Sequence, residues 1–239
     1  AEAHNNLGVL LLEQGKPDKA MVSHNRAIEH RPDYAEAHNN LGTVLQESGR
    51  LEEAITSYER AITIKPDYAL AHLNRSFALL LAGNFKKGWQ EYEWRLRIKG
   101  HVPGTAIQPI WDGKPLNGKS ILIHTEQGFG DVIQFVRYLP MVKAQGGRVT
   151  IECQQSLHRL LSGCGRIDEI IEKTTIRKPI TQFDFHIPLL SLPGIFDTTL
   201  ESIPSKMPYI IVDPDLSEQW HIRIGDKRDL KIGIVWAGN

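Results

Sequence analysis

Groups that could surround a ligand gather in residues 126–131, whose sequence is EQGFGD. An apolar run, residues 120–123, precedes this stretch, and apolar residues at helical spacing follow it from Val132 onward. That order predicts a strand, a glycine-rich turn and a helix. In such a turn the backbone can approach a ligand closely, and the amides that begin the helix face negative charge. The candidate substrate-binding residues of the turn are Glu126, Gln127, Gly128, Phe129 and Gly130.

Apolar runs alternate with helical patterns from residue 120 to residue 230, which predicts a mostly parallel sheet covered by helices, a Rossmann-like domain. Its ligand edge lies at the carboxyl ends of the strands, where we expect His124, Asp184, His186 and the loop 188–193 beside the turn. The expected strands are 120–124, 148–153, 169–171, 183–187, 209–212 and 231–236, and the expected helices are 131–145, 155–164, 192–195 and 214–224.

Several classes of protein and site are disfavoured by the sequence. The turn lacks the full GxGxxG pattern and a P-loop lysine, which argues against a dinucleotide oxidoreductase. HExxH and metal-spaced carboxylates are missing, so we expect no bound metal or cofactor. The 28 basic and 28 acidic side chains balance, which disfavours nucleic acid and anionic lipid. Cys153 and Cys164 are expected as reduced core residues of a cytoplasmic protein, and no apolar run is long enough to span a membrane.

A repeat occupies residues 1–97. The string AHNNLG at residue 3 returns at residue 37, and AHLN begins at residue 71, so the period is 34 residues, that of tetratricopeptide repeats. Small residues at 20, 27, 54 and 61 let paired helices approach closely, and Pro32 and Pro66 end the second helices. We expect three repeats, residues 1–34, 35–68 and 69–97, with helices 2–14, 18–30, 36–48, 52–64, 70–82 and 86–97 and turns at Gly15, Gly49 and Gly83.

Asn6, Asn40 and Asn74 stand one period apart, so stacked repeats would align their carboxamides along one face. Each carboxamide can donate to and accept from an extended peptide backbone, which predicts protein binding in the repeat groove. The alternative is that these side chains bond a neighbouring helix or solvent. The third repeat departs from the pattern at Arg75 and Gly88, as expected of a terminal repeat that packs against another domain.

Proline and glycine are frequent in residues 98–119, which predicts a linker between two domains, with Trp111 as a packing anchor on the second. The predicted fold class is therefore an α-helical solenoid followed by an α/β domain, residues 120–230.

The string EQGFGDVIQFVRY, residues 126–138, together with Leu139 and Pro140, resembles the GD…P signature of heptosyltransferase-like GT-B glycosyltransferases. Joined to the repeats, it resembles bacterial proteins that combine tetratricopeptide repeats with such a transferase, and the asparagine ladder is similar to that of protein O-GlcNAc transferases. The resemblance implies an acceptor domain in residues 120–230 and a donor domain that begins at residues 231–239. It also implies that this polypeptide, without the rest of the donor domain, is inactive.

The resemblance implies metal-independent transfer of a sugar from a nucleotide sugar to a protein or glycan acceptor presented by the repeats. Asp131 matches the aspartate of the family motif and is the candidate base; the alternative is a carboxylate that only complements the helix dipole, worth about 0.3 to 1 kcal/mol. Glu126 is a second acid, an orienting group or an exposed loop residue. His124 and His186 either bind the acceptor or form hydrogen bonds with buried neighbouring groups. The remaining candidate substrate-binding residues are Ser191 and Asn239.

Three functions stay open at this point, and one of them, protein O-GlcNAc transfer, shares the plan of repeats joined to a GT-B unit, although no residue here selects it over transfer of other sugars. The leading one is the glycosyltransferase, which the intact Gly130-Asp131 turn and the unbroken strand and helix alternation favour. The alternative is a tetratricopeptide scaffold that assembles partner proteins and carries a degenerate transferase domain.

Overall fold

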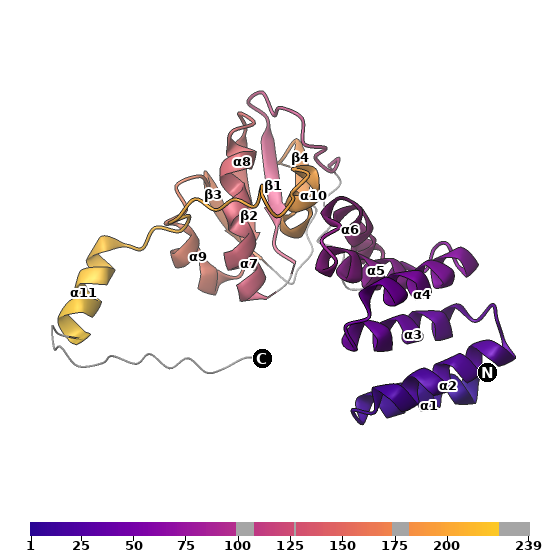
Figure 1. Ribbon diagram of the computed structural model, residues 1–239. Helices are drawn as coiled ribbons and strands as arrows, with labels where there is room; N and C mark the ends of the chain where they lie inside the picture. The colour runs from indigo at the N-terminus through magenta and orange to yellow at the C-terminus, as the bar shows by residue number, and fades with distance from the viewer. Residues whose placement is uncertain (99–107, 127, 174–181, 225–239) are drawn as a thin grey trace.

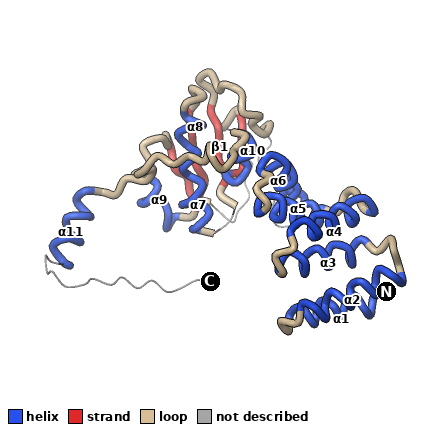
Figure 2. The backbone as a smooth tube through the Cα atoms, in the orientation of Figure 1, coloured by secondary structure: helices blue, strands red, loops and turns tan. Residues whose placement is uncertain are grey.

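The computed structural model describes residues 1–98, 108–126, 128–173 and 182–224. A stack of helices forms the N-terminal part, and a small sheet with flanking helices forms the rest (Figure 1). Figure 2 shows that the strands lie in the second part. The helices of the stack are α1 (Glu2–Glu13), α2 (Pro17–His30), α3 (Ala35–Glu47), α4 (Leu51–Ile64), α5 (Ala69–Leu81) and α6 (Phe85–Tyr92), followed by the 3-10 helix η1 (Glu93–Arg97).

The helices α1 to α5 begin and end within about one residue of their predicted bounds, so this prediction is confirmed. Glycine ends the first helix of each pair because the backbone there is left-handed. The φ angle is +69° at Gly15, +74° at Gly49 and +79° at Gly83, a region that other residues adopt at a cost.

Close contact between the two helices of a repeat depends on small residues. A Cβ atom added at Gly8 would lie 2.6 Å from the His24 ring, and one added at Gly42 would lie 2.6 Å from the Tyr58 ring. Neither position therefore has room for a side chain. The alanines expected at the helix contacts are fully buried, namely Ala20, Ala27, Ala54 and Ala61.

Successive repeats are joined by a recurrent hydrogen bond. His38 Nε2 lies 2.9 Å from the carbonyl oxygen of Pro32, and His72 Nε2 lies 2.9 Å from that of Pro66. The first helices, α1, α3 and α5, lie closer to one another across the repeats than the second helices do. The stack therefore curves with the first helices on its inner side, as in other solenoids.

The second helix of the third repeat is shorter than the predicted 86–97, because α6 ends at Tyr92 and the chain continues as η1. Arg95 stands one period after Ala61 and two periods after Ala27, so an arginine occupies a position of helix contact. A guanidinium group cannot pack where a methyl group does. Its side chain, 1% exposed, instead reaches Glu126 and Ser191 of the second part.

A four-stranded parallel sheet of order β3-β2-β1-β4 forms the centre of the second part. The small parallel sheet confirms the α/β prediction at this coarse level. The strands are β1 (Ser120–His124), β2 (Arg148–Cys153), β3 (Glu169–Glu172) and β4 (Phe185–Pro188). The helical segments are α7 (Phe129–Phe135), η2 (Val136–Tyr138), α8 (Leu139–Lys143), α9 (Gln155–Leu161), η3 (Leu189–Ser191), α10 (Leu192–Ile195) and α11 (Pro214–Ile224).

The two faces of the sheet differ in chemistry because successive strand residues point to opposite sides. One face packs against residues of α7, α8 and α9 and is apolar, with Ile121, Ile123, Val149 and Ile151 at its centre. The register places His124, Thr150, Glu152 and His186 on the opposite face. Leu122 and Ile171 share that face, so it combines polar and apolar side chains, whereas the first face is apolar.

The helix predicted at 131–145 is not continuous, because η2 separates α7 from α8. Pro140 stands in the first turn of α8, and its nitrogen has no hydrogen to continue the helical ladder. The helix predicted at 155–164 ends at Leu161.

The prediction of a strand at residues 209–212 is wrong, because the chain forms no strand there. The backbone nitrogen of Ile211 donates to the carbonyl oxygen of Gly163 at 3.3 Å, and no ladder follows among the described residues. Tyr209 and Ile210 pack against the core, whereas Ile211 and Val212 are 59% and 62% exposed, so the segment leaves the core for the surface without joining the sheet. The strand predicted at 231–236 lies outside the described residues.

Part of the predicted linker belongs to the core of the second part. Ile110 forms a parallel bridge with His186 beside β4. Trp111 is 1% exposed and donates its indole hydrogen to the carbonyl oxygen of Lys114 at 2.9 Å, and Leu116 is fully buried. Trp111 is therefore the packing anchor that its sequence context predicted.

Cys153 and Cys164 are free and buried, as expected. Within the described ranges no helix combines the length and hydropathy needed to cross a membrane. The same ranges hold no cluster of three or more His, Cys, Asp or Glu side chains that could hold a metal ion.

Candidate functional site

The first helices carry an exposed surface that we call the inner face. It comprises residues spaced four, three and four positions apart on α1, α3 and α5, which place side chains on one side of a helix. None of these residues is buried. They are Glu2, Asn6, Val9 and Glu13 on α1, Glu36, Asn40, Thr43 and Glu47 on α3, and Leu70, Asn74, Phe77 and Leu81 on α5.

Two of the predicted ladder residues bind the preceding repeat. Asn40 Nδ2 donates to Asn5 Oδ1 at 3.1 Å, and Asn74 Nδ2 donates to Asn39 Oδ1 at 3.0 Å. Asn5 and Asn39 are 6% and 2% exposed, so each bond joins a buried acceptor to a side chain on the inner face. The side-chain amide of asparagine has two N–H donors, and Asn40 and Asn74 each use one of them in this bond.

Asn6 belongs to the same row and is exposed. The sequence analysis did not single out Asn5 and Asn39. The signal was present, because the doublet Asn-Asn at 5 and 6 returns at 39 and 40. In both doublets the first asparagine is the buried acceptor, and in the doublet at 39 and 40 the second asparagine is a donor.

Glu126, predicted at the carboxyl end of β1, is bound to the repeats. Its two carboxylate oxygens accept from Arg95 Nε and Nη2, each at 2.9 Å, and the backbone nitrogen of Leu190 donates to Oε2 at 3.2 Å. The Glu126 side chain is 5% exposed. The exposed-loop interpretation of Glu126 is therefore wrong, since the carboxylate is enclosed at the junction of the two parts.

Ser191 belongs to the same junction. Its hydroxyl accepts from Arg95 Nη2 at 2.8 Å and donates to Glu93 Oε2 at 2.9 Å. Burial opposes the charge of Arg95, but the hydrogen bonds and the ion pair with Glu126 outweigh that effect and raise the pKa of the guanidinium. Sequence alone did not identify Arg95; the signal was a charged residue at an alanine position of the repeat.

His124 and His186 lie together on the face of the sheet opposite Ile121 and Ile123. His124 is fully buried, and its Nδ1 lies 3.0 Å from Glu152 Oε2. The two imidazole rings meet edge to face with their centroids 5.2 Å apart. Burial, with a smaller effect of His124, lowers the pKa of His186. Among the described residues, His124 Nε2, His186 Nδ1 and the hydroxyl of Thr150 have no hydrogen-bond partner.

The glycine-rich turn leads into α7 as predicted. Gly128 precedes the helix, Phe129 is 50% exposed, and Gly130 is exposed in the first turn. Asp131 lies in the same turn and is half-buried. Gln127 and Asn239 lie outside the described residues.

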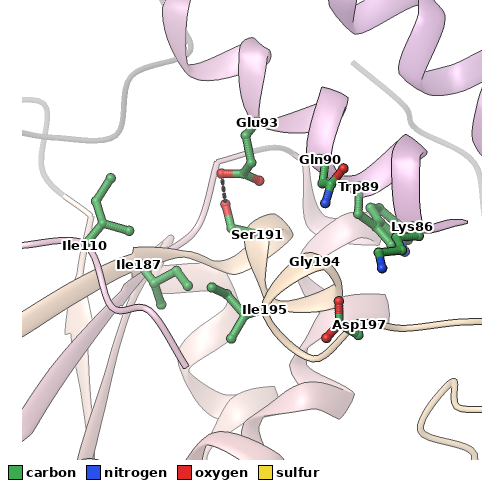
Figure 3. Close-up of a pocket in the computed structure, with 10 residues that line it drawn as sticks. All are labelled: Lys86, Trp89, Gln90, Glu93, Ile110, Ile187, Ser191, Gly194, Ile195 and Asp197. Atoms are coloured by element: carbon green, nitrogen blue, oxygen red, sulfur yellow. Dashed lines mark hydrogen bonds between the residues drawn. The ribbon is translucent and has the colours of Figure 1, made fainter. Parts of the chain in front are cut away.

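A pocket of about 220 Å³ opens where the repeats meet the second part (Figure 3). Lys86 and Trp89 of α6 line one side, and Ile195 and Asp197 line the other. The indole hydrogen of Trp89 bonds the carbonyl oxygen of Thr198 at 3.1 Å, which fixes the position of this wall. The pocket brings together residues of both parts that the sequence analysis did not associate.

Three protein-family models match the N-terminal part. Models described as tetratricopeptide repeat match residues 1–34 and 25–56, and a model described as TPR repeat matches residues 45–83. Together with the helix pairs and their period, these matches show that the N-terminal part is built of tetratricopeptide repeats. No curated protein sequence matches the chain.

Several solved structures resemble the same part. The second repeat domain of Spaghetti (RPAP3), bound to the HSP90 peptide SRMEEVD, is 22% identical, with a TM-score of 0.39 over 41% of this chain and 90% of that one. MamA is 28% identical, with a TM-score of 0.38 over 40% of this chain and 56% of that one. The Sgt2 domain from Aspergillus fumigatus is 20% identical, with a TM-score of 0.38 over 39% and 62%.

Proposed function

We propose that this chain is a protein-interaction module whose repeats bind an extended segment of another protein along the inner face. The main support is the placement of three side-chain amides, Asn6, Asn40 and Asn74, on an unburied surface at intervals of one repeat. A second N–H remains on Asn40 and on Asn74 after each has bound the preceding repeat. A peptide backbone offers one donor and one acceptor per residue, so it matches such a row without requiring one sequence.

Apolar side chains beside the asparagine row add area that a partner can bury. Leu70, Phe77 and Leu81 of α5 are 45%, 41% and 67% exposed. They are neighbours on the inner face, and exposed apolar groups gathered in this way mark interaction surfaces. Their removal from water would contribute roughly 25 cal/mol per Å² to binding.

Asn6→Ala provides the most direct test, because the Asn6 side chain is exposed and makes no bond to another repeat within the described residues. We expect the affinity for a bound peptide to fall about two- to tenfold, the effect of losing one net hydrogen bond. The melting temperature should stay unchanged. Binding is measured by fluorescence anisotropy with the tightest ligand from an array of capped 12-residue peptides.

Asn25→Ala is the matched control, since Asn25 is an exposed residue of the second helix α2. This variant should bind like the original chain. Asn40→Ala should weaken both binding and folding, because it also removes the bond to Asn5. Equal affinity of the Asn6 variant and the original chain would exclude the asparagine row as the peptide contact.

We also propose a second function for the α/β part, that of the acceptor domain of a nucleotide-sugar glycosyltransferase. Two observations support it: the parallel sheet places the glycine-rich turn at the carboxyl end of β1, and the His124 and Glu152 pair lies at the same end. Asp131, in the first turn of α7, would take a proton from the acceptor hydroxyl. The inner face would then present a protein or glycan acceptor.

Asp131→Asn is expected to lower the rate of sugar transfer at least about 100-fold, because an amide cannot accept the proton. The melting temperature should change little. The readout is nucleotide released from UDP-, GDP- or ADP-sugars in the presence of array-selected peptides. Asp215→Asn is the control, since Asp215 occupies the first turn of α11 far along the chain. Equal turnover of the Asp131 variant and the original would remove Asp131 as the base.

A further inference from the structure

The inner face changes character between the second and third repeats. On α1 and α3 its last residues are Glu13 and Glu47, both exposed. On α5 the equivalent residue is Leu81, which is 67% exposed, and Leu70 and Phe77 precede it on the same stripe. One part of the surface is therefore acidic, and the part nearest the sheet is apolar.

The glutamates of the inner face fall into two classes. Glu2 lies 3.1 Å from Arg31, and Glu36 lies 3.9 Å from Lys65, so these two carboxylates have cations of the chain beside them. Glu13 and Glu47 form no ion pair among the described residues. Each of these two stands at the carboxyl end of its helix, where the carbonyl groups add partial negative charge.

Positive charge is scarce on the same helices. The sequences of α1 and α3 contain no lysine or arginine, and α5 contains one, Arg75. Arg75 is half-buried, and its Nη2 lies 2.6 Å from Glu91 Oε1, with Glu59 at 3.8 Å from Nη1. This cation is therefore committed within the chain, and a carboxylate of a partner would find no free cation on these three helices.

We propose that the partner of the inner face is an extended segment that places basic side chains over Glu13 and Glu47 and a bulky apolar side chain over Leu70, Phe77 and Leu81. The proposal rests on the proposed peptide-binding function and specifies its ligand. Charge complementarity favours basic side chains in the partner, because the partial negative charge at the two helix ends and the two carboxylates all attract positive charge. The apolar patch fixes the direction in which the segment binds, since α5 carries three exposed apolar side chains on the inner face and α1 carries one, Val9.

The test compares pools of capped 12-residue peptides that differ in one component. The first pool is drawn from Gly, Ser, Leu, Phe and Lys, the second has Glu in place of Lys, and the third has Ser in place of Leu and Phe. We expect the first pool to bind about three- to tenfold tighter than the second at low salt. Each exposed ion pair adds only a small free energy of binding, and the contributions of the two pairs add together. The preference should shrink as the salt concentration rises. The peptide SRMEEVD serves as an acidic probe and should not bind.

A double variant tests the residues named. Glu13→Gln with Glu47→Gln should abolish the preference for lysine over glutamate. It should not change how the uncharged residues of the peptides contribute to binding. Glu29→Gln with Glu52→Gln, two exposed residues of the second helices α2 and α4, is the matched control and should keep the preference. Leu81→Ser should remove the preference for the pool that contains Leu and Phe.

The outcomes separate this inference from the function on which it rests. If no pool binds a folded chain, peptide binding by the inner face is itself excluded. If peptides bind and Asn6→Ala weakens them, but the acidic pool or SRMEEVD binds as tightly as the basic pool, the function stands and the inference is overturned. Retention of the lysine preference by the Glu13 and Glu47 double variant would also overturn it.

Discussion

Arg95→Met is expected to lower the free energy of unfolding by about 3 to 5 kcal/mol, the usual cost of removing one partner of a buried ion pair. The Glu126 carboxylate would stay enclosed with one remaining donor, the backbone nitrogen of Leu190. The Ser191 hydroxyl would lose the hydrogen bond that it now accepts from the Arg95 guanidinium. Urea unfolding followed by circular dichroism measures the change.

The double variant Arg95→Met with Glu126→Gln should recover about 2 kcal/mol of this loss, because the buried charge is gone while an acceptor for Leu190 remains. Arg148→Met is the matched control, since the Arg148 and Glu169 pair has the same 2.9 Å separation but side chains that are 63% and 45% exposed. That control should cost less than about 1 kcal/mol. A similarly small loss for Arg95→Met would show that the junction does not depend on this pair.

The same contact has a consequence for function. Arg95 belongs to the last repeat, and Glu126 stands between β1 and the glycine-rich turn. A bidentate guanidinium and carboxylate pair fixes orientation as well as distance. The inner face and the carboxyl edge of the sheet are therefore held in one arrangement, which would let a segment bound to the repeats reach that edge at a constant position.

Acid is expected to destabilise the first repeat through His24. This side chain is fully buried against Gly8, and burial lowers its pKa from 6.5 to about 4. Between these values the unfolded chain binds a proton that the folded chain does not, so the free energy of unfolding falls by about 1.4 kcal/mol per pH unit as the pH drops. The stability present above pH 6.5 is thus lost on approach to pH 4, up to roughly 3 kcal/mol in total.

His24→Phe should remove this pH dependence. A phenyl ring fits, because the Tyr58 ring occupies the equivalent place against Gly42 in the next repeat. Asn5 would lose its contact with His24 Nδ1, at 3.0 Å, but would still accept from Asn40. Urea unfolding at pH 7 and pH 4.5 measures the difference. His30→Phe, at an exposed position, should keep the acid sensitivity of the original chain; the same sensitivity in the His24 variant would assign the effect to another group.

The sequence predicted the repeats well because every signal it used was local. A helix pair of one repeat contacts mainly its neighbours, so the period, the glycine turns and the buried alanines suffice to define it. The strands β1 and β2 were predicted for a similar reason, as short apolar runs bounded by turn residues. The segment 209–212 carried the same local signal and is not a strand, because strand formation needs a neighbour with free backbone groups, which periodicity does not report.

By itself, then, the sequence determined the solenoid, its inner row of asparagines and the turn that follows β1. Tertiary structure alone decided which groups remain available. It showed that Asn40 and Asn74 each give one donor to the preceding repeat, that Glu126 and Ser191 face Arg95, and that His124 lies beside Glu152. The physical reason is that hydrogen bonds and ion pairs depend on distances between residues far apart in the chain. Local patterns fix where a helix begins, but not which side chains it meets.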